Sequence, residues 1–137
     1  MSIRTAVIGA KGRMGSHAVD AINEAEGLEL VATLGSNDPL ETLLDENIDV
    51  AVELTVPKST EDNVSFLVEH GIDTVVGTTG WDNERLARLE DKLRDHPKTA
   101  VLIAPNFSIG AVLAMRFAEL AAPYFDSAEV VEIHHTR

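Results

Sequence analysis

The sequence contains no cysteine, few aromatic residues and few basic ones. Without cysteine the chain can form neither disulfides nor thiolate metal sites, which agrees with a cytoplasmic location. Its 11 lysines and arginines are outnumbered by 23 aspartates and glutamates, giving a formal net charge of −12. Nucleic-acid binding requires a clustered positive surface, so this charge argues against a nucleic-acid partner.

Long hydrophobic runs are missing as well. The longest apolar stretch, near residues 109–115, is too short to span a bilayer, and no basic and apolar leader opens the chain. We therefore expect a cytoplasmic protein that makes no membrane contact. A length of 137 residues with 45% hydrophobic side chains suits one compact α/β domain, at most with an appendage.

The most informative segment is a short apolar run that breaks into three glycines spaced three residues apart, Gly9, Gly12 and Gly15. A helical pattern follows at once, and a pyrophosphate can approach a helix N-terminus closely only where glycine leaves room. Lys11 and Arg13 place two of the basic residues where phosphates would lie. Because the spacing differs from the commoner Gly-x-Gly-x-x-Gly, an ordinary strand-to-helix turn remains the alternative on the motif alone.

Strand patterns alternate with helical patterns through the first 104 residues. We predict strands over 3–8, 28–34, 48–55, 74–76 and 100–104, and helices over 13–25, 40–44, 58–70 and 83–95. Such alternation with short links is typical of a Rossmann-like, doubly wound parallel sheet with helices on both faces. The predicted class is therefore α/β, with a dinucleotide-binding domain over residues 1–106; periodicity does not encode the strand order.

The pattern changes after Gly110. An apolar helix over 111–122 stops at Pro123, and residues 128–135 alternate as a strand. Consecutive His134 and His135 would point to opposite faces of that strand, so we predict no metal site. One histidine could face a cleft as a proton donor, or both could be surface residues.

Two further segments follow strands at the edge where parallel sheets bind ligands, namely residues 77–80 and 105–110. In the first of these segments, Thr78 and Thr79 lie between two glycines. They offer hydroxyls and backbone donors without bulk, which suits contact with a planar nicotinamide. The alternative is an ordinary glycine turn in which Thr79 caps the next helix.

The end of the second predicted strand bears on cofactor choice. NAD-preferring folds usually place a carboxylate there, but this chain has Gly35, Ser36 and Asn37, and its first acid is Asp38. We expect NADPH to be tolerated beside NADH, with Lys11 and Arg13 as counter-charges to the 2′-phosphate. Alternatively, Asp38 bends back onto the ribose and favours NADH.

Four motifs, taken in order, resemble bacterial dihydrodipicolinate reductase, now called 4-hydroxy-tetrahydrodipicolinate reductase, and its actinobacterial branch most nearly. The resemblance spans essentially the whole chain. It implies an oxidoreductase that transfers hydride from NADPH or NADH to a cyclic dicarboxylate in diaminopimelate and lysine biosynthesis, as a cytoplasmic homotetramer. The motifs are Gly9-Ala10-Lys11-Gly12-Arg13-Met14-Gly15, Val76-Gly77-Thr78-Thr79-Gly80, Ala104-Pro105-Asn106-Phe107-Ser108-Ile109-Gly110 and Glu132-Ile133-His134-His135.

The resemblance also implies roles for individual residues. His134 would be the proton donor, and His135 would contact the substrate. The first motif would hold the pyrophosphate, and the second and third would hold the nicotinamide end. The implied cofactor-binding residues are Gly9, Ala10, Lys11, Gly12, Arg13, Met14, Gly15, Ser36, Gly77, Thr78, Thr79, Gly80, Ala104, Pro105, Asn106 and Phe107.

The family resemblance implies that residues 107–137 are the first helix and strand of an incomplete second domain for substrate binding and oligomerisation. In the family, a lysine and an Asp-Ala-Pro-Ser-Gly-Thr segment that grips substrate carboxylate follow the paired histidines, and they would lie beyond Arg137. We therefore expect a truncated reductase that binds cofactor without appreciable turnover, and whose segment 111–135 associates or is partly disordered. Two other functions stay open. One is a non-catalytic nucleotide-binding sensor, and the other is an interaction remnant that joins full-length relatives.

Overall fold

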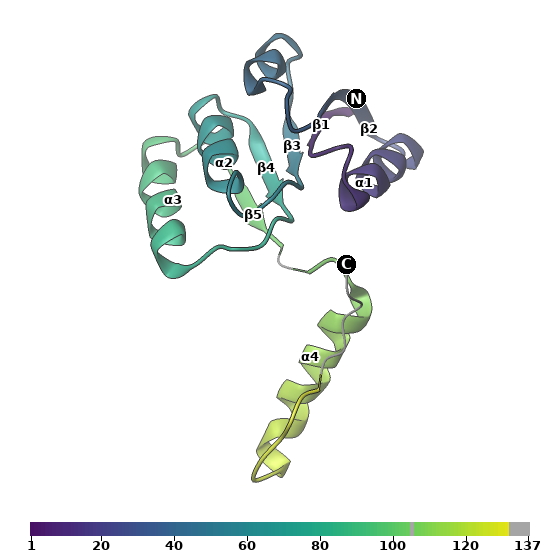
Figure 1. Ribbon diagram of the computed structural model, residues 1–137, viewed down its shortest axis with the longest axis vertical. Helices are drawn as coiled ribbons and strands as arrows, with labels where there is room; N and C mark the ends of the chain where they lie inside the picture. Colours follow the sequence, from purple (N-terminus) through teal and green to yellow (C-terminus); the bar gives the residue numbers. More distant parts are fainter. Residues whose placement is uncertain (105, 132–137) are drawn as a thin grey trace. The chain divides into compact units, whose positions relative to one another are not determined.

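The computed structural model describes residues 1–104 and 106–131. It divides the chain into two compact units, Met1–Pro105 and Asn106–Arg137. The first unit holds a five-stranded parallel sheet in the order β2-β1-β3-β4-β5 (Figure 1). This confirms the predicted Rossmann-like α/β class and supplies the strand order. The strands are β1 (Ile3–Ile8), β2 (Leu28–Leu34), β3 (Val50–Glu53), β4 (Asp73–Val76) and β5 (Val101–Ile103).

Helices cover both faces of this sheet. The connections are α1 (Arg13–Glu24), the 3₁₀ helix η1 (Leu40–Asp45), α2 (Thr60–Glu69) and α3 (Asn83–Asp95). Helix α1 packs on β1 and β2, whereas α2 packs on β3, β4 and α3. Because crossovers between parallel strands are right-handed, the reversal of direction after β2 puts α1 on one face and η1, α2 and α3 on the other (Figure 1).

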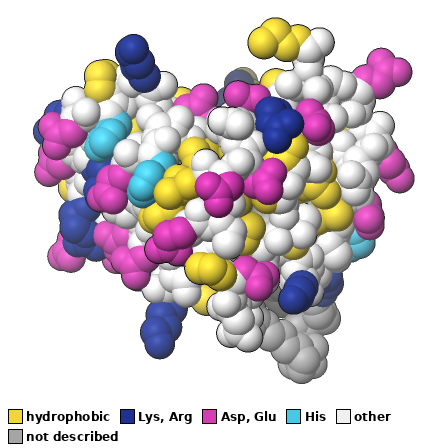
Figure 2. Space-filling model, turned by 90° about the horizontal axis from the view of Figure 1, so that it is seen from above, with side chains coloured by type: hydrophobic (Ala, Val, Ile, Leu, Met, Phe, Trp, Pro, Cys, Tyr) yellow, Lys and Arg dark blue, Asp and Glu magenta, His cyan; other side chains and the backbone are white. Residues whose placement is uncertain are grey.

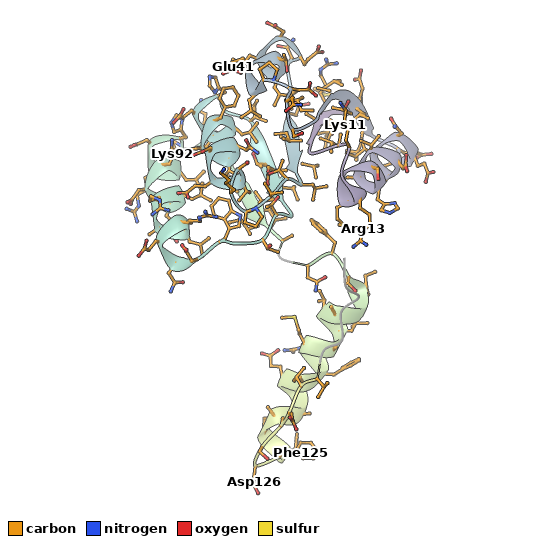
Figure 3. The ribbon with its side chains drawn as sticks, viewed as in Figure 1. Lys11, Arg13, Glu41, Lys92, Phe125 and Asp126 are labelled. Atoms are coloured by element: carbon orange, nitrogen blue, oxygen red, sulfur yellow. The ribbon has the colours of Figure 1, made fainter. Side chains whose placement is uncertain are left out.

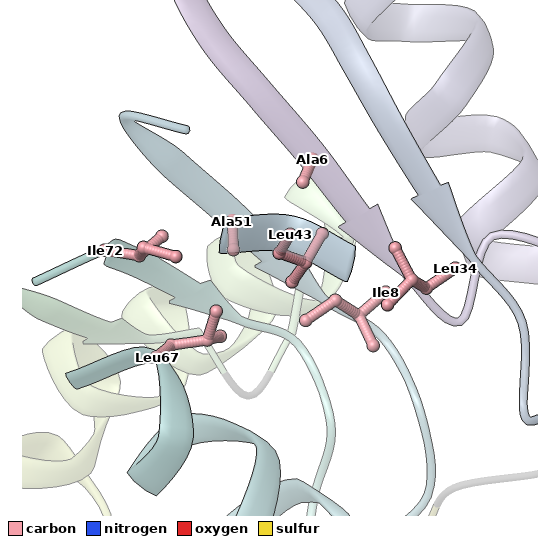
Figure 4. Close-up of a cluster of buried hydrophobic side chains, with 7 residues drawn as sticks. All are labelled: Ala6, Ile8, Leu34, Leu43, Ala51, Leu67 and Ile72. Carbon is pink, nitrogen blue, oxygen red and sulfur yellow. The ribbon is translucent and has the colours of Figure 1, made fainter. Parts of the chain in front are cut away.

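The main core lies between the sheet and the face that carries η1 and α2. Strand alternation turns Ala6, Ile8 and Ala51 toward this face, where they meet Leu43 of η1 and Leu67 of α2 (Figure 4). Both leucines are fully buried, and each such side chain stabilises the fold by roughly 1.5–3 kcal/mol. A second cluster joins α2 to β4 and α3 through Val64, Val68, Val76 and Leu89.

Ion pairs on the surface link α2 to α3. Glu61 accepts a 2.6 Å hydrogen bond from Arg88 Nε and lies 3.2 Å from Arg85 Nε, and Lys92 pairs with Glu69. The hydrogen bond from Arg88 lowers the pKa of Glu61, and the one from Lys92 lowers the pKa of Glu69. Acidic side chains are otherwise spread over the face shown in Figure 2 rather than gathered in one patch.

The second unit is largely helical in its described part. It contains α4 (Ile109–Ala121) and a 3₁₀ turn, η2 (Ala122–Tyr124), and the Ser108 hydroxyl caps α4 by accepting from the Ala111 amide. Large apolar side chains of α4 are exposed, among them Ile109, Met115 and Phe117. None of the helices in the described segments is long and apolar enough to cross a membrane.

The strand predicted over 128–135 is wrong for its described part, because residues 128–131 belong to no strand. A strand is stabilised by pairing with a neighbour, and the described residues of the second unit contain no other strand. Residues 132–135 lie outside the described residues. The helix predicted over 58–70 is shorter as α2, because the Ser59 and Thr60 amides turn back to the Val56 carbonyl before the helix begins.

Candidate functional site

The glycine loop is closed by two backbone contacts that exclude a side chain. Gly9 has φ +85°, and a Cβ there would lie 2.2 Å from the Leu54 carbonyl oxygen. Gly15 is buried in the first turns of α1, and its Cβ would lie 2.0 Å from the Gly9 carbonyl oxygen. The chain between β1 and α1 can therefore turn this tightly only with glycine at both positions.

Gly12 has a different role in the same loop. It is the N-cap of α1, with an extended backbone at φ −75°, and its amide donates to the Gly9 carbonyl at 3.0 Å. Lys11 and Arg13 are exposed around it (Figure 3), as is Met14. Within the first turn of α1, no acidic side chain neutralises the positive end of the helix dipole, which favours an anionic ligand.

A cavity of about 430 Å³ opens beside this loop, at the carboxyl ends of β1, β2 and β3. Strands β1 and β3 are adjacent, and the chain leaves them toward opposite faces of the sheet. Such a switch in direction is where open parallel sheets bind ligands. The cavity is lined by Ile8, Gly9, Lys11, Gly12, Gly35, Ser36, Asp38, Leu40, Leu54, Thr55, Val56, Ser59 and Asn63.

Charges of both signs border the β2 side of the cavity. Asp38 folds back on its own turn, where its Oδ2 accepts a 2.7 Å hydrogen bond from the Gly35 amide. The Lys11 side chain passes over the same glycine, with its Cδ 3.1 Å from the point that a Gly35 Cβ would occupy. A ribose hydroxyl or phosphate at this corner would thus meet a lysine and an aspartate together.

The loop after β4 uses one of its two threonines internally. Thr78 is buried, and its hydroxyl accepts a 2.8 Å hydrogen bond from the Thr55 amide. Thr79 and Gly80 are exposed. The possibility that Thr79 caps the next helix is wrong, because the N-cap of α3 is Asp82, whose carboxylate accepts from the Arg85 amide at 2.9 Å.

The remaining predicted residues fall in several places. Ala104 follows β5, and its amide bonds to the Val76 carbonyl at 2.8 Å, while Asn106 and Phe107 belong to the second unit. The side-chain oxygen of Asn106 accepts from the Ser108 amide at 2.8 Å. Pro105, His134 and His135 lie outside the described residues. Among the described residues, no group of three His, Cys, Asp or Glu side chains could hold a metal ion.

Sequence reasoning missed the β3 side of the site. Thr55, Ser59 and Asn63 line the cavity, and beneath them the carboxyl group of Glu53 is fully buried. The available signal was an acid and a threonine at the end of an otherwise apolar strand. Their significance depends on the packing of α2 against β3, which periodicity does not give.

Comparison with known proteins identifies the family. The family described as "Dihydrodipicolinate reductase, N-terminus" matches residues 3–107. This chain belongs to the dihydrodipicolinate reductase family. The 4-hydroxy-tetrahydrodipicolinate reductase of Streptomyces avermitilis is 62% identical over 133 residues, covering 97% of this chain and 53% of the relative. The reductase of Beutenbergia cavernae is 56% identical over 137 residues, covering 100% of this chain and 55% of that relative.

Solved structures agree with this assignment. Dipicolinate-bound dihydrodipicolinate reductase from Paenisporosarcina sp. TG-14 has a TM-score of 0.78 and 32% identity, over 91% of this chain and 55% of that one. GenD2 from gentamicin A biosynthesis, in complex with NAD, has a TM-score of 0.70 and 15% identity, over 88% of this chain and 40% of that one. At this identity the likeness shows a shared fold alone. The chain spans about half the length of the curated reductases it matches.

Because the backbones of Gly9 and Gly15 are in contact, one methyl group added at position 15 should strongly lower the stability of the fold. In Gly15→Ala the new Cβ would require the Gly9 backbone to move, and we expect a loss of about 3 kcal/mol in the free energy of unfolding. Urea denaturation followed by circular dichroism measures this loss. Gly110→Ala is the matched control, because its Cβ would meet only Ser108 Oγ at 3.8 Å within helix α4. Equal midpoints for wild type and Gly15→Ala would contradict the described turn.

Proposed function

We propose that this chain is the cofactor-binding part of an NAD(P)H-dependent 4-hydroxy-tetrahydrodipicolinate reductase. The observation that carries the proposal is the glycine loop, which opens onto a cavity at the switch point of the sheet in a chain of this family. Both the space at the helix N-terminus and the absence of an acid in its first turn suit a pyrophosphate.

The residues of the first unit fit a dinucleotide from one end to the other. Gly9, Gly12 and the start of α1 would hold the pyrophosphate, and the cavity between β2 and β3 would take the adenosine. The exposed Thr79 and Gly80 after β4 would face the nicotinamide end, as would Ala104 after β5. The same role is proposed for Pro105, Asn106 and Phe107 on the family resemblance alone. When bound, the reduced nicotinamide supplies the hydride, and the loops of this chain fix where its ring lies.

The substrate and assembly are proposed for the whole reductase. The Paenisporosarcina relative holds dipicolinate, a cyclic dicarboxylate, which supports a substrate of that class. We propose that His134 donates the proton that accompanies hydride transfer and that His135 contacts the substrate. In the same way we propose a homotetramer acting in diaminopimelate and lysine biosynthesis.

Both NADH and NADPH suit the β2 corner of the cavity. Lys11 offers a cation to a 2′-phosphate, and the Asp38 carboxylate opposes that anion but is already hydrogen-bonded to the Gly35 amide. These two influences partly cancel, so we propose use of both cofactors rather than strict NAD dependence.

Binding of NADH to the wild-type chain and to Gly12→Ala tests the proposed function. A Cβ at Gly12 would lie 3.2 Å from the Gly9 oxygen, which must shift by a few tenths of an ångström, so circular dichroism first checks that the variant is folded. Its methyl group would occupy space the pyrophosphate needs. We expect saturable binding by wild type in isothermal titration calorimetry and at least about a tenfold weaker affinity in the variant. Absence of saturable binding by a folded wild-type chain would refute the proposal.

Charge variants at the β2 corner test cofactor preference. Asp38→Asn keeps an oxygen acceptor for the Gly35 amide but removes the negative charge, so NADPH affinity should rise about threefold or more relative to NADH. Lys11→Gln should lower NADPH affinity about tenfold and change NADH affinity little. Lys98→Gln, just before β5 at the opposite edge of the sheet, is the matched control. Equal changes for both cofactors would exclude contact with the 2′-phosphate.

A further inference from the structure

Glu53 is an unusual residue at the last position of β3. Its side chain is completely buried, although most glutamates of the chain lie on the surface. Among the described residues, no basic group lies within ion-pair distance of its carboxyl group. Burial of such a polar group is unfavourable unless hydrogen bonds replace those it made with water.

Three neutral donors surround the carboxyl group. The Thr60 hydroxyl donates to Oε2 at 2.7 Å, Asn63 Nδ2 donates to Oε1 at 3.1 Å, and the Thr55 hydroxyl also donates to Oε1. Asn63 Nδ2 additionally lies 3.3 Å from Thr55 Oγ1. The carboxyl group therefore ties the end of β3 to the loop that follows it and to the first turn of α2.

This network continues into the proposed cofactor site on two sides. Thr55 and Asn63 line the cavity beside the glycine loop. On the other side, the Thr55 amide donates to the Thr78 hydroxyl at 2.8 Å, which joins the loop after β3 to the loop after β4. Thr55 is thus held by Glu53 through its side chain and holds Thr78 through its backbone.

We infer that Glu53 is a positioning residue for the dinucleotide. Its buried carboxyl group fixes Thr55, and Thr55 fixes the β4 loop relative to the adenosine cavity, so that one extended ligand can contact both. The inference rests on the proposed function, because it concerns the same cofactor. Filling the space beneath Thr55 does not require a carboxyl group, since apolar side chains that replace all the partners of a buried polar cluster at similar volume can leave stability nearly unchanged. A carboxyl group, however, can accept from three donors at once and so hold the loop in one orientation.

The ligands that separate this role from general stabilisation are NADH and ADP. ADP occupies the cavity and the glycine loop alone, whereas NADH also reaches the β4 loop. A misplaced β4 loop should therefore weaken NADH binding more than ADP binding. A purely structural role for Glu53 would change both affinities by the same factor, or neither.

The experiment is isothermal titration of Glu53→Gln, Thr55→Val and Thr55→Ser with both ligands. We expect Glu53→Gln and Thr55→Val to bind NADH about tenfold more weakly and ADP at most about threefold more weakly than wild type does. Thr55→Ser, which keeps the hydroxyl, should restore NADH affinity to within about twofold of wild type. Glu90→Gln, on the exposed surface of α3, is the matched control and should bind both ligands as wild type does.

Each outcome decides the question. Equal losses for NADH and ADP, unchanged affinities in folded variants, or failure of Thr55→Ser to restore binding would overturn the positioning role. If Glu53→Gln does not fold, Thr55→Val and Thr55→Ser still test the role, because the first removes and the second keeps the hydroxyl that donates to Glu53. If wild type binds neither ligand, the proposed function itself fails. If wild type binds both ligands and the variants bind them with the same affinities, only the positioning role fails.

Discussion

The site depends on the close approach of three backbone segments at Gly9. Its carbonyl lies against Gly15 of α1, and its α-carbon faces the Leu54 carbonyl beyond β3, with no room for a methyl group on either side. This contact sets the start of α1 relative to β1 and β3. The position of the helix N-terminus, the mouth of the cavity and the place of a pyrophosphate all follow from it.

A polar network extends the same constraint across the sheet. Glu53 pairs with Ile8 of β1, and its hydrogen bonds hold the loop at Thr55, which holds Thr78 beyond β4. Loops that bind ligands are otherwise the mobile parts of a fold, and here hydrogen bonds through Glu53 and Thr78 hold the loops after β3 and β4. The first unit therefore offers a ligand several loops whose relative positions are already determined, which lowers the entropy lost on binding.

Much of the first unit could be predicted from local pattern. The strand over residues 28–34 and the helix over residues 83–95 have the predicted bounds, because a turn cluster ends the strand and Asp82 begins the helix. The roles of Glu53 and Thr55 could not be predicted, since they arise from packing between β3 and α2, and from the pairing that brings β4 alongside. The predicted strand after η2 failed at 128–131 for a related reason, because alternation indicates a strand but does not supply its partner.

The proposed function requires that the carboxyl edge of β1, β2 and β3 holds a dinucleotide. Titration of the ¹⁵N-labelled chain with NADH, followed by amide chemical shifts, tests it most directly. A dinucleotide bound there should give saturable shifts concentrated at the three loops 9–15, 35–38 and 54–59 and at residues 79–80 after β4, with residues 96–99 at the opposite edge of the sheet unaffected. Saturable shifts centred on residues 96–99, or none at the three loops, would contradict it.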